Sequence, residues 1–211
     1  MARSRRLFLP GVSQHVIQRG NNRCDIFRSP EDYEVFLSLL REALTKHPLE
    51  LHAYVLMTNH VHFMVTPDSA RALPGVMQSL ECRYVRYFND RYLRTGGLFD
   101  GRYRALMVDD ERYWFMCMRY IELNPLRAGL AATPDAYPWS SYHAHALGTS
   151  DSIVAPHTLY LALGATSSDR ERSWRGLCGV PLASDELAEI RAAVNRGQLP
   201  SRVVFPETAG I

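Results

Sequence analysis

Two β-rich runs and the short connection between them decide the fold: LELHAYVLM at residues 49–57, TNH at 58–60 and VHFMVT at 61–66. Branched and aromatic residues fill both runs and a polar turn separates them, which is the pattern of an antiparallel hairpin. Successive side chains of a strand point to opposite faces of the sheet. His60 and His62 therefore share one face, and we expect the apolar side chains that alternate with them to point into the core.

The segments around this hairpin alternate between strand and helix patterns. Ser29 before Pro30 is a typical helix start, and Asn124 before Pro125 is a typical helix end. The other expected elements are a strand at 15–19, helices at 30–46, 73–92 and 109–123, and a strand within 98–108. The order β-α-β-β-α-β-α predicts an α+β protein with a ferredoxin-like split βαβ sandwich, in which the helices cover one face of an antiparallel sheet.

The composition changes after residue 130. Pro, Ala and Ser become frequent there, and only residues 185–195 have a recognisable helix pattern. We therefore predict a first domain at 1–130 and a C-terminal extension at 131–211 that is partly helical or irregular.

Composition excludes several classes of protein. The 211 residues are 46% hydrophobic and 22% charged, which is ordinary for a globular protein. The longest apolar runs are far shorter than the roughly 18 residues of a membrane span. The basic N-terminus precedes no long apolar segment, so we expect a cytoplasmic protein that does not insert into membranes. The four cysteines are too widely spaced for a CxxC zinc or redox motif.

Basic charge concentrates in the predicted first domain. Residues 1–130 hold 18 Lys and Arg against 14 Asp and Glu, whereas residues 131–211 hold 6 against 8. All but one of the basic residues in the first domain are arginines, whose planar fork suits bidentate phosphate contacts. The bias hints at a nucleic-acid partner, although genome composition also produces an arginine excess.

The third expected helix carries a candidate nucleophile. Tyr120 and Asn124 are four residues apart, so they share one helix face. A phenol with a pKa near ~10 needs a cation beside it to attack a phosphodiester, and His60, His62 and the Asn124 side-chain carbonyl are suitable ligands. Each residue alone also has an ordinary explanation: a surface histidine pair, a core tyrosine, or an asparagine at a helix end.

Two motifs together resemble a known family. MTNHVHF at residues 57–63 resembles the His-hydrophobic-His (HUH) motif, and RYIELNPLRAG at 119–129 resembles the catalytic-tyrosine helix, of single-tyrosine HUH transposases of the insertion-sequence type. The similarity is closer to the REP-associated tyrosine transposase branch and covers about residues 3–143. Supporting similarities are Pro10-Gly11, His15-Val16, Arg19-Gly20-Asn21, Tyr84 to Asn89, Gly97-Leu98-Phe99, Gly101-Arg102-Tyr103 and Trp139-Ser140-Ser141-Tyr142.

The resemblance implies a metal-dependent transposase with its nuclease domain at 1–130. It would cleave and rejoin single-stranded DNA near hairpins or palindromic elements through a 5′-phosphotyrosine link to Tyr120. By the same resemblance His60 and His62 bind a divalent ion, Mg²⁺ or Mn²⁺, and Asn124 takes the third ligand position. That position is commonly Gln in the insertion-sequence branch, whereas Asn resembles the REP-associated branch. We expect a monomer or a homodimer.

Several arginines are candidates for DNA binding because they lie near the start of the chain, on the second helix or beside strand ends. They are Arg3, Arg5, Arg6, Arg19, Arg23, Arg83, Arg86, Arg102 and Arg104. A solvated tail and surface ion pairs are the ordinary alternatives. We also expect His15, on the first strand, to support the site structurally rather than to bind the metal.

Two other functions compete with strand transfer. Split βαβ domains also serve as non-catalytic modules that bind hairpin DNA or RNA, although this chain has no aromatic strand of the RNA-recognition type. A single-turnover HUH nickase would share the histidine pair but not the Tyr-x-x-x-Asn spacing of the third helix. Formation of a covalent protein-DNA adduct, followed by rejoining, separates the three.

Overall fold

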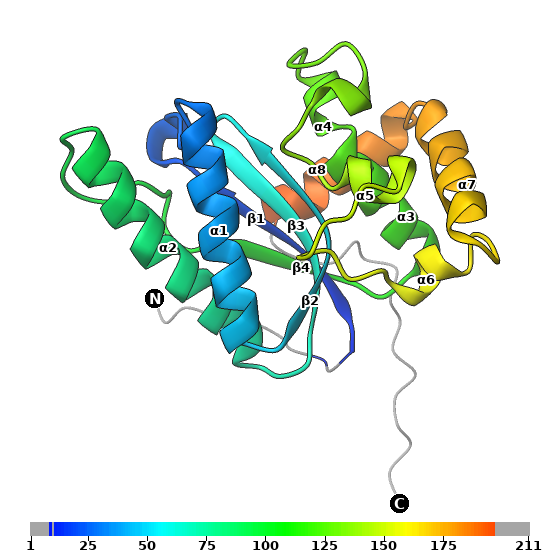
Figure 1. The fold of residues 1–211 in the computed structure, drawn as a ribbon, viewed down its shortest axis with the longest axis horizontal. Helices are drawn as coiled ribbons and strands as arrows, with labels where there is room; N and C mark the ends of the chain where they lie inside the picture. Colours follow the sequence, from blue (N-terminus) through cyan, green and yellow to red (C-terminus); the bar gives the residue numbers. More distant parts are fainter. Residues whose placement is uncertain (1–8, 10, 197–211) are drawn as a thin grey trace, which may run out of the picture.

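An antiparallel four-stranded sheet runs through the centre of the computed structural model, which describes residues 9 and 11–196 (Figure 1). The strands are β1 (Ser13–Arg19), β2 (Leu49–Met57), β3 (His60–Pro67) and β4 (Arg104–Val108). They lie in the order β2-β3-β1-β4, with every neighbouring pair antiparallel. This is the strand order of a ferredoxin-like split βαβ fold, so the predicted α+β class is confirmed.

The strand register fixes which side chains share a face. Met57 of β2 lies opposite His60 of β3, so the turn of the hairpin is Thr58-Asn59 alone and His60 already belongs to the strand. On the other side of β3, Ile17 of β1 lies opposite His62. Because directly opposed residues point to the same face, β1 contributes side chains to the face that carries the two histidines.

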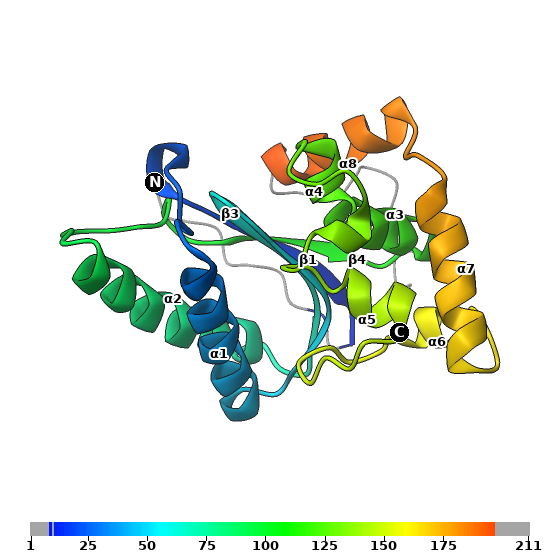
Figure 2. The same cartoon turned by 45° about the horizontal axis from the view of Figure 1, so that its top comes forward.

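Helices α1 (Pro30–Lys46) and α2 (Ala72–Arg91) cover the opposite face of the sheet (Figure 2). The start of α1 forms as predicted, with Pro30 at the first helical position and a capping box between Ser29 and Asp32. Phe63 of β3 packs into this layer together with Leu40 and Leu80, and all three are almost fully buried.

The prediction that helices cover one face only is wrong, because α3 (Glu111–Glu122) packs on the histidine face, against β2, β3 and β4. Asp110 caps this helix by accepting a hydrogen bond from the Tyr113 N–H. The short helix α4 (Asn124–Arg127) follows directly. The physical reason lies in β2, where residues 51–57 are all buried: apart from His52 this run has no strongly polar residue on either side, which indicates burial on both faces.

The chain after residue 130 continues this second layer. It contains a 3-10 turn (Pro134–Ala136) and the helices α5 (Tyr142–Leu147), α6 (Thr158–Leu161), α7 (Ser167–Gly179) and α8 (Ser184–Arg196). Tyr142, Trp174 and Ile190 of these helices join one apolar cluster with Trp114 of α3. The extension therefore shares a hydrophobic core with the first part of the chain, while the boundary near residue 130 stays a prediction. None of the helices described is long and apolar enough to cross a bilayer.

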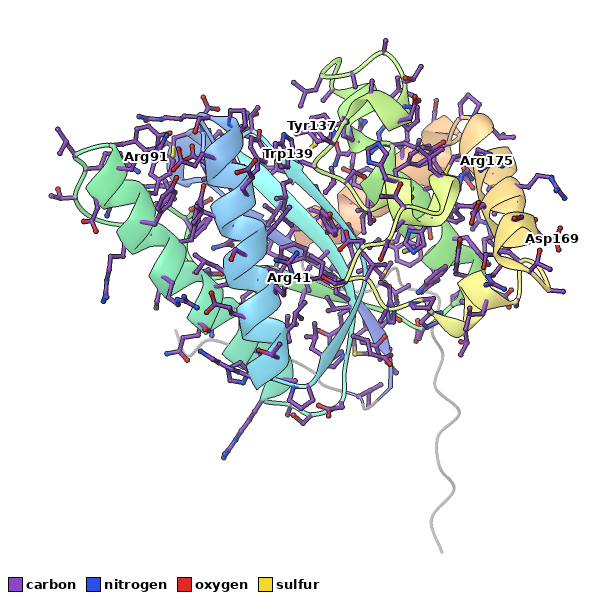
Figure 3. The ribbon with its side chains drawn as sticks, viewed as in Figure 1. Arg41, Arg91, Tyr137, Trp139, Asp169 and Arg175 are labelled. Carbon is purple, nitrogen blue, oxygen red and sulfur yellow. The ribbon has the colours of Figure 1, made fainter. Side chains whose placement is uncertain are left out.

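Residues 139–155 link the two layers along the outer edge of β2. The Leu56 N–H donates to the Trp139 carbonyl, and the Ser141 N–H donates to the Tyr54 carbonyl. The Trp139 ring stacks on Tyr33 of α1, with ring centroids 4.7 Å apart (Figure 3). Edge strands are commonly protected by such a covering segment.

A buried carboxylate attaches the C-terminal helices to α3. Glu122 is almost fully buried and accepts hydrogen bonds from Ser141 Oγ at 2.6 Å, His145 Nδ1 at 2.7 Å and Trp174 Nε1 at 2.8 Å. These donors precede α5 or lie on α5 and α7. Because its carboxylate faces this network, Glu122 serves the packing of α3 rather than the chemistry of Tyr120.

We expect Glu122→Ala to lower the free energy of unfolding by about 3 kcal/mol, because three buried donors lose their acceptor. Urea unfolding followed by circular dichroism measures the change. Glu111→Ala, on the exposed first turn of the same helix, is the control. Equal stabilities of the two variants would contradict this role of the carboxylate.

Candidate functional site

The two histidines of β3 and the tyrosine of α3 lie together on the histidine face. The ring centroids of His60 and His62 are 5.0 Å apart, and the centroid of the Tyr120 ring is 5.6 Å from that of His62. Both pairs meet edge to face. His62 is almost fully buried, whereas His60 and Tyr120 are half-buried and thus partly open to solvent. The sequence expectation that these residues converge agrees with the fold.

The protonation of His60 follows from its neighbour. Asn59 Nδ2 donates to the Arg23 carbonyl at 3.1 Å, which turns the amide oxygen toward His60 Nδ1 at 2.7 Å. That oxygen only accepts, so Nδ1 carries the proton. Burial and, to a smaller extent, the nearby Arg19 charge lower the pKa of His60 to about 4. The ring is therefore neutral at pH 7, and its Nε2 has a free lone pair.

His62 is held from the first strand. His15 is fully buried, and its Nε2 lies 2.9 Å from His62 Nδ1, with the two rings stacked. Burial lowers the pKa of His15 to about 3 and that of His62 well below its ordinary value. Both rings are neutral, so the bond has one donor and one acceptor. When His62 Nδ1 donates, His62 Nε2 is left as an acceptor, and no described residue forms a hydrogen bond with that buried atom.

The side chains that could act as metal ligands here fit a divalent ion. His60 Nε2 and the unpartnered His62 Nε2 are imidazole nitrogens in the form that ligates metal, and an amide side chain follows at Asn124, the first residue of α4. Asn124 is mostly buried, and its Nδ2 also has no partner among residues 9 and 11–196. The same residues hold no cluster of three His, Cys, Asp or Glu, so water or substrate oxygens would complete a shell around Mg²⁺ or Mn²⁺.

Four of the candidate DNA-binding arginines gather beside this site. Arg19, Arg23, Arg102 and Arg104 line one pocket of about 380 Å³. Arg19 lies directly opposite His60 in the β1-β3 register, so the pocket adjoins the histidines on the same face.

The remaining candidate arginines lie elsewhere. Arg83 and Arg86 lie on α2, in the layer on the other side of the sheet, where Arg83 pairs with Glu42 of α1 at 2.7 Å. Arg91, near the end of the same helix, pairs with Glu31 (Figure 3). Arg3, Arg5 and Arg6 fall outside the described residues.

Sequence reasoning missed one residue at the site. The guanidinium carbon of Arg127 lies 4.3 Å from the centroid of the Tyr120 ring, and its Nη2 donates to the Tyr120 carbonyl at 2.6 Å. Spacing gave no reliable signal, because Tyr120 lies on α3 and Arg127 on α4, and the two helices are separated at Leu123.

Comparison with known proteins identifies related chains. The model of a family described as IS200-like transposases matches residues 9–124. No curated protein matches the chain.

One solved structure supports the fold, and two further ones are less similar. A REP-associated tyrosine transposase bound to a REP hairpin is 16% identical, with a TM-score of 0.56, and the match covers 74% of this chain and 93% of that one. A proposed transposase from Deinococcus radiodurans is 20% identical, with a TM-score of 0.40 and coverage of 53% and 89%. The tRNA(His) guanylyltransferase of Saccharomyces cerevisiae is 10% identical, with a TM-score of 0.40 and coverage of 97% and 85%.

We expect His60→Ala to weaken Mn²⁺ binding by at least about tenfold, because one of two free imidazole nitrogens is lost. Isothermal titration with Mn²⁺ alone measures the affinity. The control is His143→Ala, since His143 lies on α5 and bonds to the Asp135 carbonyl instead. Unchanged Mn²⁺ affinity after loss of His60 would show that the ion binds elsewhere.

Proposed function

The chain belongs to the IS200-like transposase family, and from this we propose that it is a metal-dependent DNA strand transferase whose nucleophile is Tyr120. The observation that carries the proposal is the edge-to-face contact of the Tyr120 ring with His62, beside His60. A phenol and two neutral imidazoles drawn from separate elements meet on one partly open face. Such a group suits attack on a phosphodiester, although the Tyr120 ring also packs against the apolar cluster of α3.

The proposed substrate is single-stranded DNA next to a hairpin. The structural neighbour of similar fold is a transposase bound to a REP hairpin, which supports hairpin DNA as the substrate class. The pocket lined by Arg19, Arg23, Arg102 and Arg104 adds a cationic surface beside the histidines. A flexible single strand threads such a surface more readily than a duplex and presents its phosphate for in-line attack.

The proposed reaction exchanges one phosphodiester for another. The Tyr120 oxygen forms a bond to phosphorus and its proton leaves to solvent. The bond from phosphorus to the 3′ oxygen breaks, and that oxygen takes up a proton as a free 3′-hydroxyl. The protein then holds a 5′-phosphotyrosine, which a 3′-hydroxyl can attack to rejoin DNA. The exchange needs no nucleotide cofactor, because the energy of the broken bond is retained in the new one.

The residues of the site have separate roles in the proposed reaction. His60 and His62, with Asn124, would hold a divalent ion, which when bound polarises the phosphate and neutralises developing charge. The Asn59 side chain orients His60, and His15 orients His62. Tyr120 is positioned by α3, which the Glu122 network fixes to the C-terminal helices.

We expect the chain to form a covalent adduct with DNA that Tyr120→Phe cannot form, because phenylalanine has no attacking oxygen. A labelled hairpin with single-stranded flanks, taken from inverted repeats beside the coding sequence, is incubated with Mn²⁺ and separated on a denaturing gel. Tyr113→Phe, on the same helix, is the control. An adduct that survives Tyr120→Phe would assign the nucleophile elsewhere.

The same gel distinguishes the competing functions. Rejoined DNA products support a strand transferase, whereas an adduct without rejoining indicates a single-turnover nickase. Hairpin binding with no adduct at any metal concentration indicates a non-catalytic binding module.

We expect Arg102→Ala to weaken hairpin binding and to reduce its dependence on salt by about one released ion, because one phosphate contact is lost. Fluorescence anisotropy over a range of salt concentrations measures the slope. Arg83→Ala removes an arginine already paired with Glu42 in the other layer, and we expect an unchanged slope. Equal losses in both variants would show that the DNA also contacts the α1-α2 layer.

A further inference from the structure

Arg127, the last residue of α4, is held rigidly against the nucleophile. Its guanidinium packs over the Tyr120 ring at 4.3 Å, while Nη2 donates to the Tyr120 carbonyl at 2.6 Å. That carbonyl belongs to the last turn of α3, where backbone acceptors lack partners inside the helix. A stacked ring and a hydrogen bond together fix the plane of the guanidinium.

The other end of this guanidinium is unsatisfied. Nη1 is buried and has no hydrogen-bond partner within the described part of the chain. In that same part, no carboxylate lies within ion-pair distance of Arg127. A cation taken out of water without a counter-charge is costly, so buried charges are normally paired. No described residue supplies a counter-charge for Nη1, so this nitrogen is available to an anion from outside the described residues.

The surroundings of Arg127 favour that anion further. Burial lowers the pKa of Arg127 to about 10, and Arg191 of α8 adds a second positive charge nearby. The group still carries its charge at neutral pH. The Tyr120 ring contacts both Arg127 and His62, with its centroid 4.3 Å from the guanidinium carbon and 5.6 Å from the His62 ring centroid.

We propose that Arg127 is a further catalytic residue whose free Nη1 contacts a non-bridging oxygen of the scissile phosphate. The inference rests on the proposed function, since it needs a phosphate beside Tyr120. Negative charge grows on these oxygens as the Tyr120 oxygen approaches, and a fixed donor aimed at them stabilises the transition state. No proton is transferred: Arg127 stays a cation throughout.

The ordinary alternative is that Arg127 only caps the end of α3. Arg119, one residue before Tyr120, provides a matched control. It also donates to a backbone carbonyl, that of Val180, and its Nε also lacks a partner. Only Arg127 contacts the Tyr120 ring, so the two arginines share the structural role and differ in the catalytic one.

The test compares Arg127→Ala and Arg119→Ala in single-turnover adduct formation on the labelled hairpin with Mn²⁺. We expect Arg127→Ala to slow the adduct by about 100-fold, and Arg127→Lys to slow it by about tenfold because the planar fork is lost. Arg119→Ala should keep the parent rate. Added guanidinium ion should raise the rate of adduct formation by Arg127→Ala about tenfold. It should leave the rate of Arg119→Ala unchanged.

Each outcome has a separate meaning. Thermal unfolding and hairpin binding are measured alongside, and both should be close to the parent in Arg127→Ala. Adduct formation at the parent rate in Arg127→Ala overturns the inference. So does a slower rate that guanidinium does not restore and that accompanies a lower melting temperature. Both results leave the proposed function intact. No adduct from the parent chain overturns the proposed function, and with it this role of Arg127.

Discussion

Burial of one face of the sheet beneath α3 is the constraint on which the site depends. A surface histidine titrates near neutral pH, whereas His15 and His62 lie inside the protein and His60 lies half inside. Desolvation keeps all three uncharged, so His60 and His62 each keep an Nε2 lone pair for an electrophile, while His15 supports His62 through the hydrogen bond to its Nδ1. The same layer carries Tyr120, so the element that desolvates the imidazoles also carries the proposed nucleophile. The packing of α3 on the sheet thus accounts both for the low pKa values of the histidines and for the position of Tyr120.

The C-terminal helices contribute to the proposed site by anchoring α3. Glu122 lies two residues beyond Tyr120, and its three hydrogen bonds tie α3 to segments from the far end of the chain. A helix anchored by polar bonds on its buried side has little freedom to rotate. The phenol and the amide of Asn124 therefore keep their angular relation to the sheet. In this sense the extension belongs to the machinery of the first domain.

Sequence patterns predicted the local elements well and the long-range contacts poorly. The capping box at Ser29, the Asp110 cap and the hairpin of β2 and β3 follow from residues close in sequence. The partners of Glu122 lie 19 to 52 residues away, and no local pattern indicates them. The covering of both sheet faces was missed because strand alternation suggested one wet face. Arg127 was missed because an arginine at a helix end is ordinary until its neighbours in space are known.

The segment that borders β2 has a consequence for self-association. Tyr54 and Leu56 use backbone groups on their outer side to bond residues of the same chain. A second molecule cannot add its own strand there without first displacing Trp139 and the residues after it. Any continuous sheet spanning two copies would have to form through β4 at the opposite border, where Arg104 already holds the Val194 carbonyl of α8. The fold thereby closes the β2 border to strand addition and leaves β4 as the border at which two sheets could join.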